Sequence, residues 1–166
     1  MIGTYHHEIE LLPAVQDYLR GERLLIIDGR LVPARSGATL DCVDPATGEV
    51  VARVAAAGRE DVDAAVDAAR RAFRPDSSWR RMTPPQRARL LWRLADLIDE
   101  NTEELAQLES LDQGKPLSVS RSADIPGSAE TFRYMAGWVT KLEGRTIPIG
   151  IPDSAVAYTR REPVGV

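Results

Sequence analysis

TPPQRARLLWRLADLIDE, residues 83–100, is the stretch that decides how the middle of the chain folds. Thr83 is a good N-cap, Pro84 occupies the first helical position, and Gln86 stands where a capping-box side chain reaches back to the cap. Leucine and isoleucine then recur at helical spacing as far as Ile98. The stretch therefore predicts an amphipathic helix that begins at residue 84.

The next segment, NTEELAQLESLDQGKP at residues 101–116, predicts a second helix. Asn101 can cap it, with Glu104 three residues further on. Gly114 followed closely by Pro116 is a helix stop, because glycine accepts a left-handed conformation and proline cannot continue a helix. Three more helices are predicted from apolar residues at the same spacing, at residues 11–19, 60–73 and from 129 to near Gly144.

Hairpins are predicted on both sides of these helices. Asp28-Gly29 between two apolar runs favours a type I′ turn, and the turn sequence at 44–48 joins possible strands at 38–43 and 49–56. A third hairpin is expected at 145–161, with a turn at 152–154, and Pro148 and Pro152 make its first strand an edge strand. Every strand pair is hairpin-connected, so we expect an α+β arrangement without three adjacent parallel strands.

Composition excludes several classes of protein. The 166 residues are 43% hydrophobic and 28% charged, which is too apolar for a disordered chain. No apolar run approaches the roughly 18 residues of a transmembrane helix, and the charged first twenty residues do not resemble a secretory signal. The formal charge of −4 does not indicate the basic surface that nucleic-acid-binding proteins carry. We expect a cytoplasmic protein with no membrane and no nucleic-acid partner.

Few residues could carry chemistry. Cys42 would need a neighbouring base to act as a nucleophile, and the histidines, His6 and His7, stand in what we predict is a loose N-terminus. Lys115 follows Gly114 as in a phosphate-binding loop, but it lies at a predicted helix end, where the helix dipole already favours a cation. We therefore interpret Cys42 as a packed apolar residue and predict no catalytic apparatus.

Two of the short arginine pairs in the chain are Arg80-Arg81 and Arg160-Arg161. We interpret both pairs as solvated surface, because nothing in the surrounding sequence pairs them with a ligand motif.

The order of the elements resembles the opening of NAD(P)-dependent aldehyde dehydrogenases over roughly residues 20–166. The turn Asp44-Pro45-Ala46-Thr47-Gly48 departs from that pattern only in Asp44, where the family commonly has asparagine, and both side chains can cap a turn. The other stretches that carry the resemblance are Leu25–Arg30, Glu60–Val66, Trp79, Gln86–Leu91, Leu94–Ile98, Leu108–Pro116, Tyr134–Trp138, Gly144–Pro148 and Tyr158–Val166.

The resemblance implies a fold and a division of the chain. Residues 1–144 would form the N-terminal hairpins and helices of a Rossmann-type α/β cofactor domain. Residues 145–166 would form an oligomerisation hairpin, of which 145–161 contacts a second subunit, and the start of a return strand. Family members oxidise an aldehyde to a carboxylic acid with NAD or NADP. Their cofactor loop, glutamate and catalytic cysteine lie beyond the matching part, so we expect no catalytic residue and no tight cofactor site here.

One family site could be retained in part. Many members hold a structural monovalent cation through two backbone carbonyls and an aspartate, and the matching positions are Cys42, Val43 and Asp112. Carbonyl and carboxylate oxygens suit a hard cation. The alternative is that Asp112 is a helix-end charge near Lys115.

Three hypotheses follow from the resemblance. The chain ends at Glu162-Pro163-Val164-Gly165-Val166 without a cap or polar tail, which favours the N-terminal piece of an aldehyde dehydrogenase, inactive alone. The alternative is a non-enzymatic module that docks onto a full-length relative through residues 145–161. For the isolated chain we expect self-association through these same residues. An unrelated helical domain is the third, and the motif order argues against it.

Overall fold

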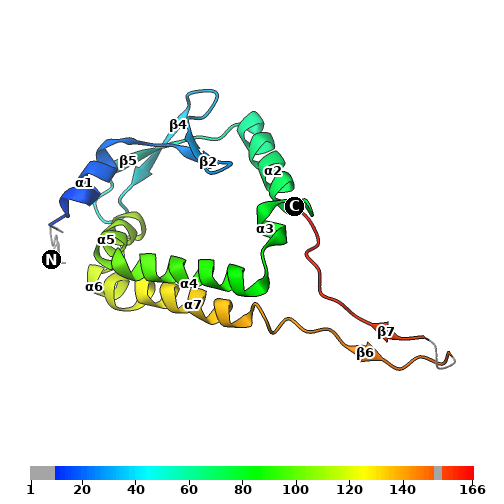
Figure 1. The fold of residues 1–166 in the computed structure, drawn as a ribbon. Coiled ribbons are helices and arrows are strands. Elements are labelled where there is room, and N and C mark those ends of the chain that lie inside the picture. The colour runs from blue at the N-terminus through cyan, green and yellow to red at the C-terminus, as the bar shows by residue number, and fades with distance from the viewer. Residues whose placement is uncertain (1–9, 152–154) are drawn as a thin grey trace.

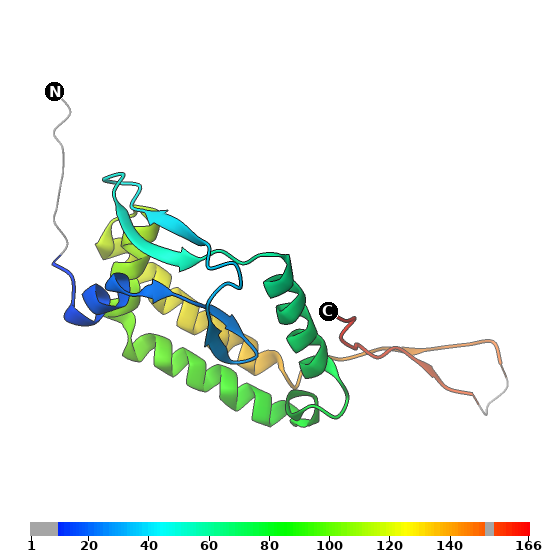
Figure 2. The same ribbon diagram turned by 90° about the horizontal axis from the view of Figure 1, so that it is seen from above.

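The computed structural model describes residues 10–151 and 155–166, so His6, His7 and the turn predicted at 152–154 lie outside the described residues. Two small sheets lie on one side of the molecule and a pair of long helices lies on the other, with a hairpin arm projecting away from both (Figures 1 and 2). The order along the chain is α1 (Pro13–Arg20), β1 (Glu22–Arg23), β2 (Leu25–Ile27), β3 (Arg30–Val32), β4 (Thr39–Val43), β5 (Val50–Ala55), α2 (Arg59–Phe73), α3 (Ser78–Arg81), α4 (Pro84–Glu100), α5 (Thr102–Gln113), α6 (Leu117–Val119), the π-helical turn η1 (Ser120–Asp124), α7 (Ile125–Trp138), β6 (Thr146–Ile147) and β7 (Ala157–Tyr158).

The first two predicted hairpins are confirmed. Strands β2 and β3 pair antiparallel around Asp28 and Gly29, whose φ angles of 55° and 72° are those of a type I′ turn. Strands β4 and β5 pair antiparallel around the turn at 44–48. In that turn the carboxylate of Asp44 accepts a hydrogen bond from the Ala46 N–H at 2.8 Å, so an aspartate closes the turn at this position.

One strand pair is not connected by a hairpin, and there the prediction was wrong. Strand β1 pairs parallel with β5, Glu22 opposite Arg53, to give a three-stranded sheet in the order β1-β5-β4. The residues between β1 and β5 hold the β2–β3 hairpin and strand β4, which is enough chain for the crossover that parallel pairing needs. The described residues contain a mixed sheet with one parallel pair, so the α+β description of this part of the chain holds.

Helix α4 begins at residue 84, as predicted. The Thr83 N–H donates to Oε1 of Gln86 at 2.7 Å, the reach-back half of the capping box. Asn101 does not cap α5 as expected: its side-chain amide donates to the Leu97 carbonyl at 2.8 Å. The amide thus pairs with a carbonyl in the last turn of α4. The same side chain is then not available to cap α5. Gly114 ends α5 with φ 70°, as predicted.

The last long helix differs from its prediction at both ends. Residues 117–138 form one helical run in which η1 precedes Pro126. Proline in a helix interior removes a hydrogen bond and clashes with the preceding turn, and a π-turn relieves that clash. The helix ends at Trp138, not near Gly144, and the base of the arm follows at Arg145.

Helices α4 and α7 pack against each other along their lengths (Figure 1). Ala95 of α4 and Ala129 of α7 are fully buried, and side chains this small allow a close approach of the two backbones. Arg133 of α7 bridges the pair with a hydrogen bond of 3.0 Å to Asp96 and a second to Asp99, and these bonds raise the pKa of Arg133. A small-residue seam with a charged bridge therefore holds the two helices.

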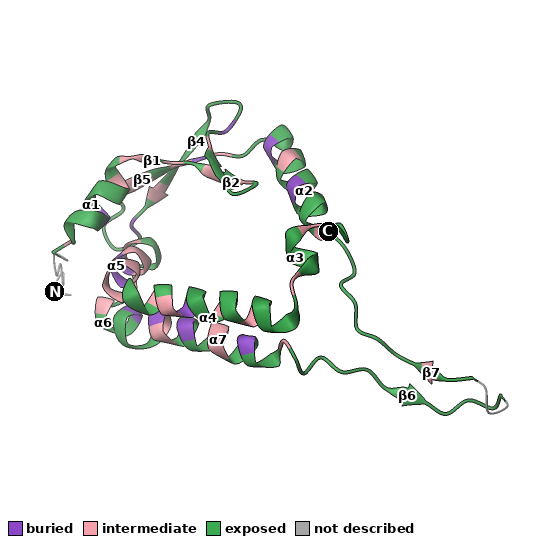
Figure 3. Ribbon diagram, viewed as in Figure 1, coloured by how far each residue is buried: buried purple, intermediate pink, exposed green. Residues whose placement is uncertain are grey.

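The buried core is small, and most of the ribbon in Figure 3 has the green of exposed residues. Alanines make up most of the buried apolar residues among those described, while larger side chains such as Trp92, Tyr134 and Met135 stay more than half exposed. Where exposed side chains this large form a continuous apolar patch, the patch is unusual for an isolated monomer. No helix within residues 10–151 and 155–166 is long and apolar enough to cross a bilayer.

The N-terminal helix is tied to α5 through Gln107, whose side chain is 3% exposed. Its Oε1 accepts from the Leu12 N–H at 2.9 Å, and its Nε2 donates to Oε1 of Glu103 at 3.0 Å. A second donation from Nε2 reaches the Glu10 carbonyl at 3.4 Å. A buried amide with all these partners fixes where the chain enters α1.

The arm is closed at its base. The Arg145 N–H donates to Oγ1 of Thr159 and the Thr159 N–H donates to the Arg145 carbonyl, both at 2.8 Å. A side chain at Gly144 would collide with the Thr159 carbonyl, so the close approach requires glycine there. Strands β6 and β7 then pair antiparallel, with Thr146 opposite Tyr158.

Candidate functional site

The expected cation ligands lie at the junction of β4 and α5. Cys42 and Asp112 both line a cavity of about 350 Å³ between the β4–β5 hairpin and α5. Val43 follows Cys42 at the end of β4, has an exposed side chain, and is not among the residues that line the cavity. Two of the three predicted positions are thus brought to one cavity.

A direct contact between a turn and a helix end forms this junction. Gly114, two residues beyond Asp112, lies so close to the turn at 44–48 that an added Cβ would stand 2.7 Å from Cγ of Pro45. Asp44 fixes the turn from inside and is itself 8% exposed. The chain therefore positions the β4 end against the last turn of α5 through Pro45 and Gly114.

The ion pairs around the cavity involve Lys115 and two acidic residues other than Asp112. Lys115 pairs with Glu109 at 3.1 Å and with Asp124 at 2.9 Å, and hydrogen bonds to Asp124 and Glu109 raise the pKa of the lysine. Within the described ranges, Asp112 takes part in no ion pair with a basic side chain. The lysine thus neutralises its two partners and leaves Asp112 at the cavity.

Sequence reasoning missed two charged residues that line the same cavity, Glu109 and Arg23. Glu109 stands three residues before Asp112 on α5, and this spacing places both carboxylates on one helix face. Arg23 comes from β1, whose parallel pairing with β5 no local pattern indicated. The guanidinium of Arg23 lies over the ring of Tyr18, 4.1 Å from its centroid.

The donor set fits a hard monovalent cation better than a transition metal. In the part of the chain that the structure describes, no three His, Cys, Asp or Glu side chains are grouped so that they could hold a metal ion. A site here would depend on backbone carbonyls at Cys42 and Val43 together with the Asp112 carboxylate, which are all oxygen donors.

Cys42 has no catalytic surroundings in the described structure. Its side chain is half-buried, and the residues that share its cavity include no histidine. A thiol needs a base or a strong positive field to become a nucleophile. The interpretation of Cys42 as a packed small residue agrees with this placement.

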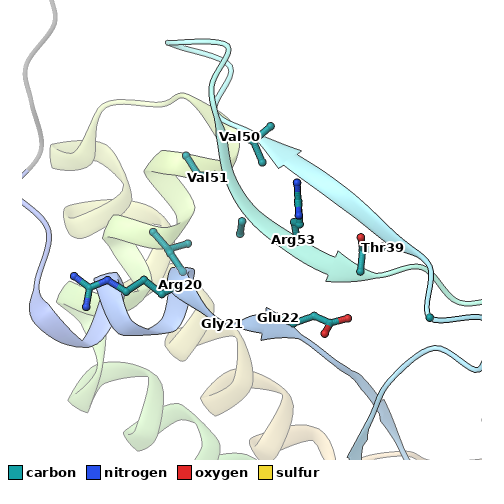
Figure 4. Close-up of a pocket in the computed structure, with 10 residues that line it drawn as sticks. Arg20, Gly21, Glu22, Thr39, Val50, Val51 and Arg53 are labelled. Carbon is teal, nitrogen blue, oxygen red and sulfur yellow. The ribbon is translucent and has the colours of Figure 1, made fainter.

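A larger concavity of about 680 Å³ lies between α1 and the β4–β5 hairpin (Figure 4). Its charged residues include Arg20 and Arg53, and each is already paired, with Asp17 at 2.9 Å and Asp41 at 3.1 Å. Its lining contains no histidine, cysteine or lysine. This concavity offers neither a nucleophile nor a phosphate cradle.

Comparisons with known proteins agree on one family. A model described as the aldehyde dehydrogenase family matches residues 31–166. The mitochondrial aldehyde dehydrogenase of Equus caballus is 49% identical over 142 residues, which are 86% of this chain and 28% of that protein.

Solved structures give the same result. The NAD⁺ complex of aldehyde dehydrogenase from Bacillus cereus matches with a TM-score of 0.88 at 49% identity, over 94% of this chain and 31% of that one. The NAD-dependent aldehyde dehydrogenase from Sinorhizobium meliloti matches with a TM-score of 0.73 at 40% identity, over 82% of this chain and 26% of that one. The chain spans less than a third of the length of these relatives.

Proposed function

Because this chain belongs to the aldehyde dehydrogenase family, we propose that it supplies the N-terminal part of an enzyme that oxidises an aldehyde to a carboxylic acid with NAD⁺ or NADP⁺. The observation that carries the proposal is the match to the Bacillus cereus enzyme over 94% of the chain. A TM-score of 0.88 at 49% identity means that sequence and backbone agree over this part of the family fold. The activity itself belongs to the whole protein.

The role proposed for these 166 residues is structural. Neither of the two cavities described above combines a glycine-rich turn with a helix start, the arrangement that cradles a dinucleotide pyrophosphate. These two cavities therefore do not fit a tightly bound NAD(P)⁺. The described residues provide instead the α4–α7 pair, the small sheets and the arm, onto which a cofactor domain would pack.

The purified 166-residue chain is expected to have no aldehyde dehydrogenase activity. Within residues 10–151 and 155–166, Cys42 has no neighbouring histidine in its cavity that could activate it as a nucleophile. Mixed with NAD⁺ or NADP⁺ and a panel of aldehydes, it should produce no NAD(P)H absorbance above the blank. Turnover that Cys42→Ser abolishes would contradict this expectation and make Cys42 the nucleophile.

The coding DNA after Val166 separates the two roles that the family leaves open. An in-frame continuation into Pro-Trp-Asn supports the N-terminal part of an enzyme. An immediate stop codon together with stable expression favours the alternative, a non-enzymatic module that docks onto a full-length relative.

The cation site is proposed at the Cys42 and Val43 carbonyls and the Asp112 carboxylate. If K⁺ or Na⁺ binds only the folded chain, then at about ten times its dissociation constant it adds about 1.4 kcal/mol to the free energy of unfolding. For a chain of this length that corresponds to a rise in Tm of about 3–6 °C. Thermal unfolding in potassium, sodium and choline chloride at equal ionic strength measures it.

Asp112→Asn should remove the dependence of Tm on the cation. Asp63→Asn, an exposed position on α2 that pairs with Arg59, is the matched control and should retain it. Equal Tm values for the unmodified chain in all three salts would reject the site.

The arm is proposed as the contact with a second copy of the chain or with a family subunit. Val156 and Tyr158 are 77% and 70% exposed, and the two-residue strands β6 and β7 leave open backbone groups on an edge. Such an edge pairs with another chain unless it is covered.

Sedimentation across a concentration series should show self-association that Val156→Lys weakens. Val164→Lys lies outside the arm at a fully exposed position and should leave the association unchanged. A chain that remains monomeric at high concentration would show that the arm does not drive assembly.

A further inference from the structure

Four arginines from distant parts of the chain line one cavity of about 370 Å³. Arg80 comes from α3, Arg87 from the start of α4, and Arg160 and Arg161 from the extended segment after β7. The C-terminal end of the chain lies beside α3 in Figure 1. Arg80 of the first basic pair and both arginines of the second, interpreted from the sequence as solvated surface, thus line the same open cavity.

The cavity is strongly positive on a protein that is negative as a whole. Its lining holds four arginines and one glutamate, an excess of three positive charges, while the chain carries −4. The one ion pair that the described residues form within the lining joins Arg160 to Glu162, 3.1 Å apart. Cations that converge without matching anions repel one another, so the arrangement favours a negatively charged occupant.

The remaining guanidinium groups have donors left over. Arg80 stacks over the Phe73 ring at 5.0 Å from its centroid, and half-buried Arg87 donates to the Met82 carbonyl at 2.6 Å. Arg161 makes no ion pair with any acidic residue inside the described ranges. A guanidinium has five N–H donors in a planar fork that matches carboxylate and phosphate oxygens.

From this geometry we propose that the cavity between α3, α4 and the segment 160–163 binds a small phosphate-bearing anion. The volume lies in the range of small-molecule sites and exceeds what a single acidic side chain would fill. Trp79 adds an aromatic wall. Its lining shares no residue with the cavity of the proposed cation site.

Calorimetric titration of the purified chain with inorganic pyrophosphate at low ionic strength tests the proposal. The double variant Arg80→Gln/Arg161→Gln should weaken binding by at least about tenfold, because each hydrogen bond to a charged group is worth roughly that factor. The matched control Arg59→Gln/Arg89→Gln removes the same charge from α2 and α4 outside the cavity and should stay within about twofold. Circular dichroism checks that each variant is folded.

A charge-conserving variant keeps the test decisive if the double variant unfolds. Arg80→Lys/Arg161→Lys preserves the positive charge but loses the planar fork of guanidinium N–H donors. Its affinity for pyrophosphate should therefore lie between that of the unmodified chain and that of the glutamine variant. The proposal is overturned if millimolar pyrophosphate gives no heat, or if the control loses as much affinity as the cavity variant. It is equally overturned if tetraglutamate binds more tightly than pyrophosphate, since the cavity would then be a docking surface for an acidic protein segment.

Discussion

Gly114→Ala is expected to lower the free energy of unfolding by about 2–5 kcal/mol, a large loss for a single added methyl group. Two costs combine at this position. The backbone has φ 70°, where an L-residue is strained, and the new Cβ would stand 2.7 Å from Cγ of Pro45. Neither cost can be relieved separately, because moving the backbone away from Pro45 also separates the turn at 44–48 from α5.

Urea unfolding followed by circular dichroism measures the effect, and Gly127→Ala is the matched control. Gly127 lies in α7 with open space where a Cβ would stand, so alanine there should stabilise the chain by about 0.5–1 kcal/mol. An alanine at 114 that is as well tolerated as the one at 127 would mean that the Pro45 contact does not hold the junction.

Ala129→Leu should cost about 1–3 kcal/mol, because the added side chain must force α4 and α7 apart. Ala129 is fully buried, as is Ala95 on the facing helix, and the seam leaves no room for a branched side chain. Separation of the helices would also lengthen the bonds from Arg133 to Asp96 and Asp99. The free energy of unfolding in urea should therefore fall.

Ser128→Leu adds similar bulk one residue earlier, at an exposed position on α7, and is the control. It removes only a local bond from the Ser128 hydroxyl to the Asp124 carbonyl and should change stability by less than about 0.5 kcal/mol. Equal losses at 128 and 129 would show that the α4–α7 contact is looser than the burial of Ala129 indicates.

Local signals in the sequence located the elements they govern. Asp28-Gly29 specified a type I′ hairpin because both residues must take positive φ, and the structure has both angles. Gly114 specified the end of α5 for the same conformational reason. Signals of this kind depend on a few adjacent residues, so a single sequence is enough to recognise them.

Two kinds of feature could not be predicted from such local signals. One is the choice that a side chain makes between two partners within its reach, and the other is pairing between segments far apart in the chain. The side chain of Asn101 could bond either at the end of α4 or at the start of α5, and its amide donates to a carbonyl at the end of α4. The parallel pairing of Glu22 with Arg53 leaves no local pattern, because β1 is only two residues long. The arginine cavity depends on a segment some eighty residues from α3, which composition alone had made look like ordinary surface.

The three positions of the candidate cation site were predicted only from the family resemblance. That Cys42 and Asp112 share a cavity depends on the Pro45–Gly114 contact, which joins two elements with no pattern in common. Helical periodicity could have predicted the neighbouring carboxylate of Glu109, because Glu109 stands three residues before Asp112 on the same helix face.

The attachment of α1 to Gln107 has a consequence for the order in which the chain folds. The Leu12 N–H and its acceptor are 95 residues apart, so closing this contact costs far more chain entropy than closing a hairpin. During synthesis the N-terminal segment leaves the ribosome long before its anchor on α5 exists. Hairpin β2–β3 and helix α4 can form from local contacts meanwhile, so the first helix of the sequence is expected to be among the last to dock.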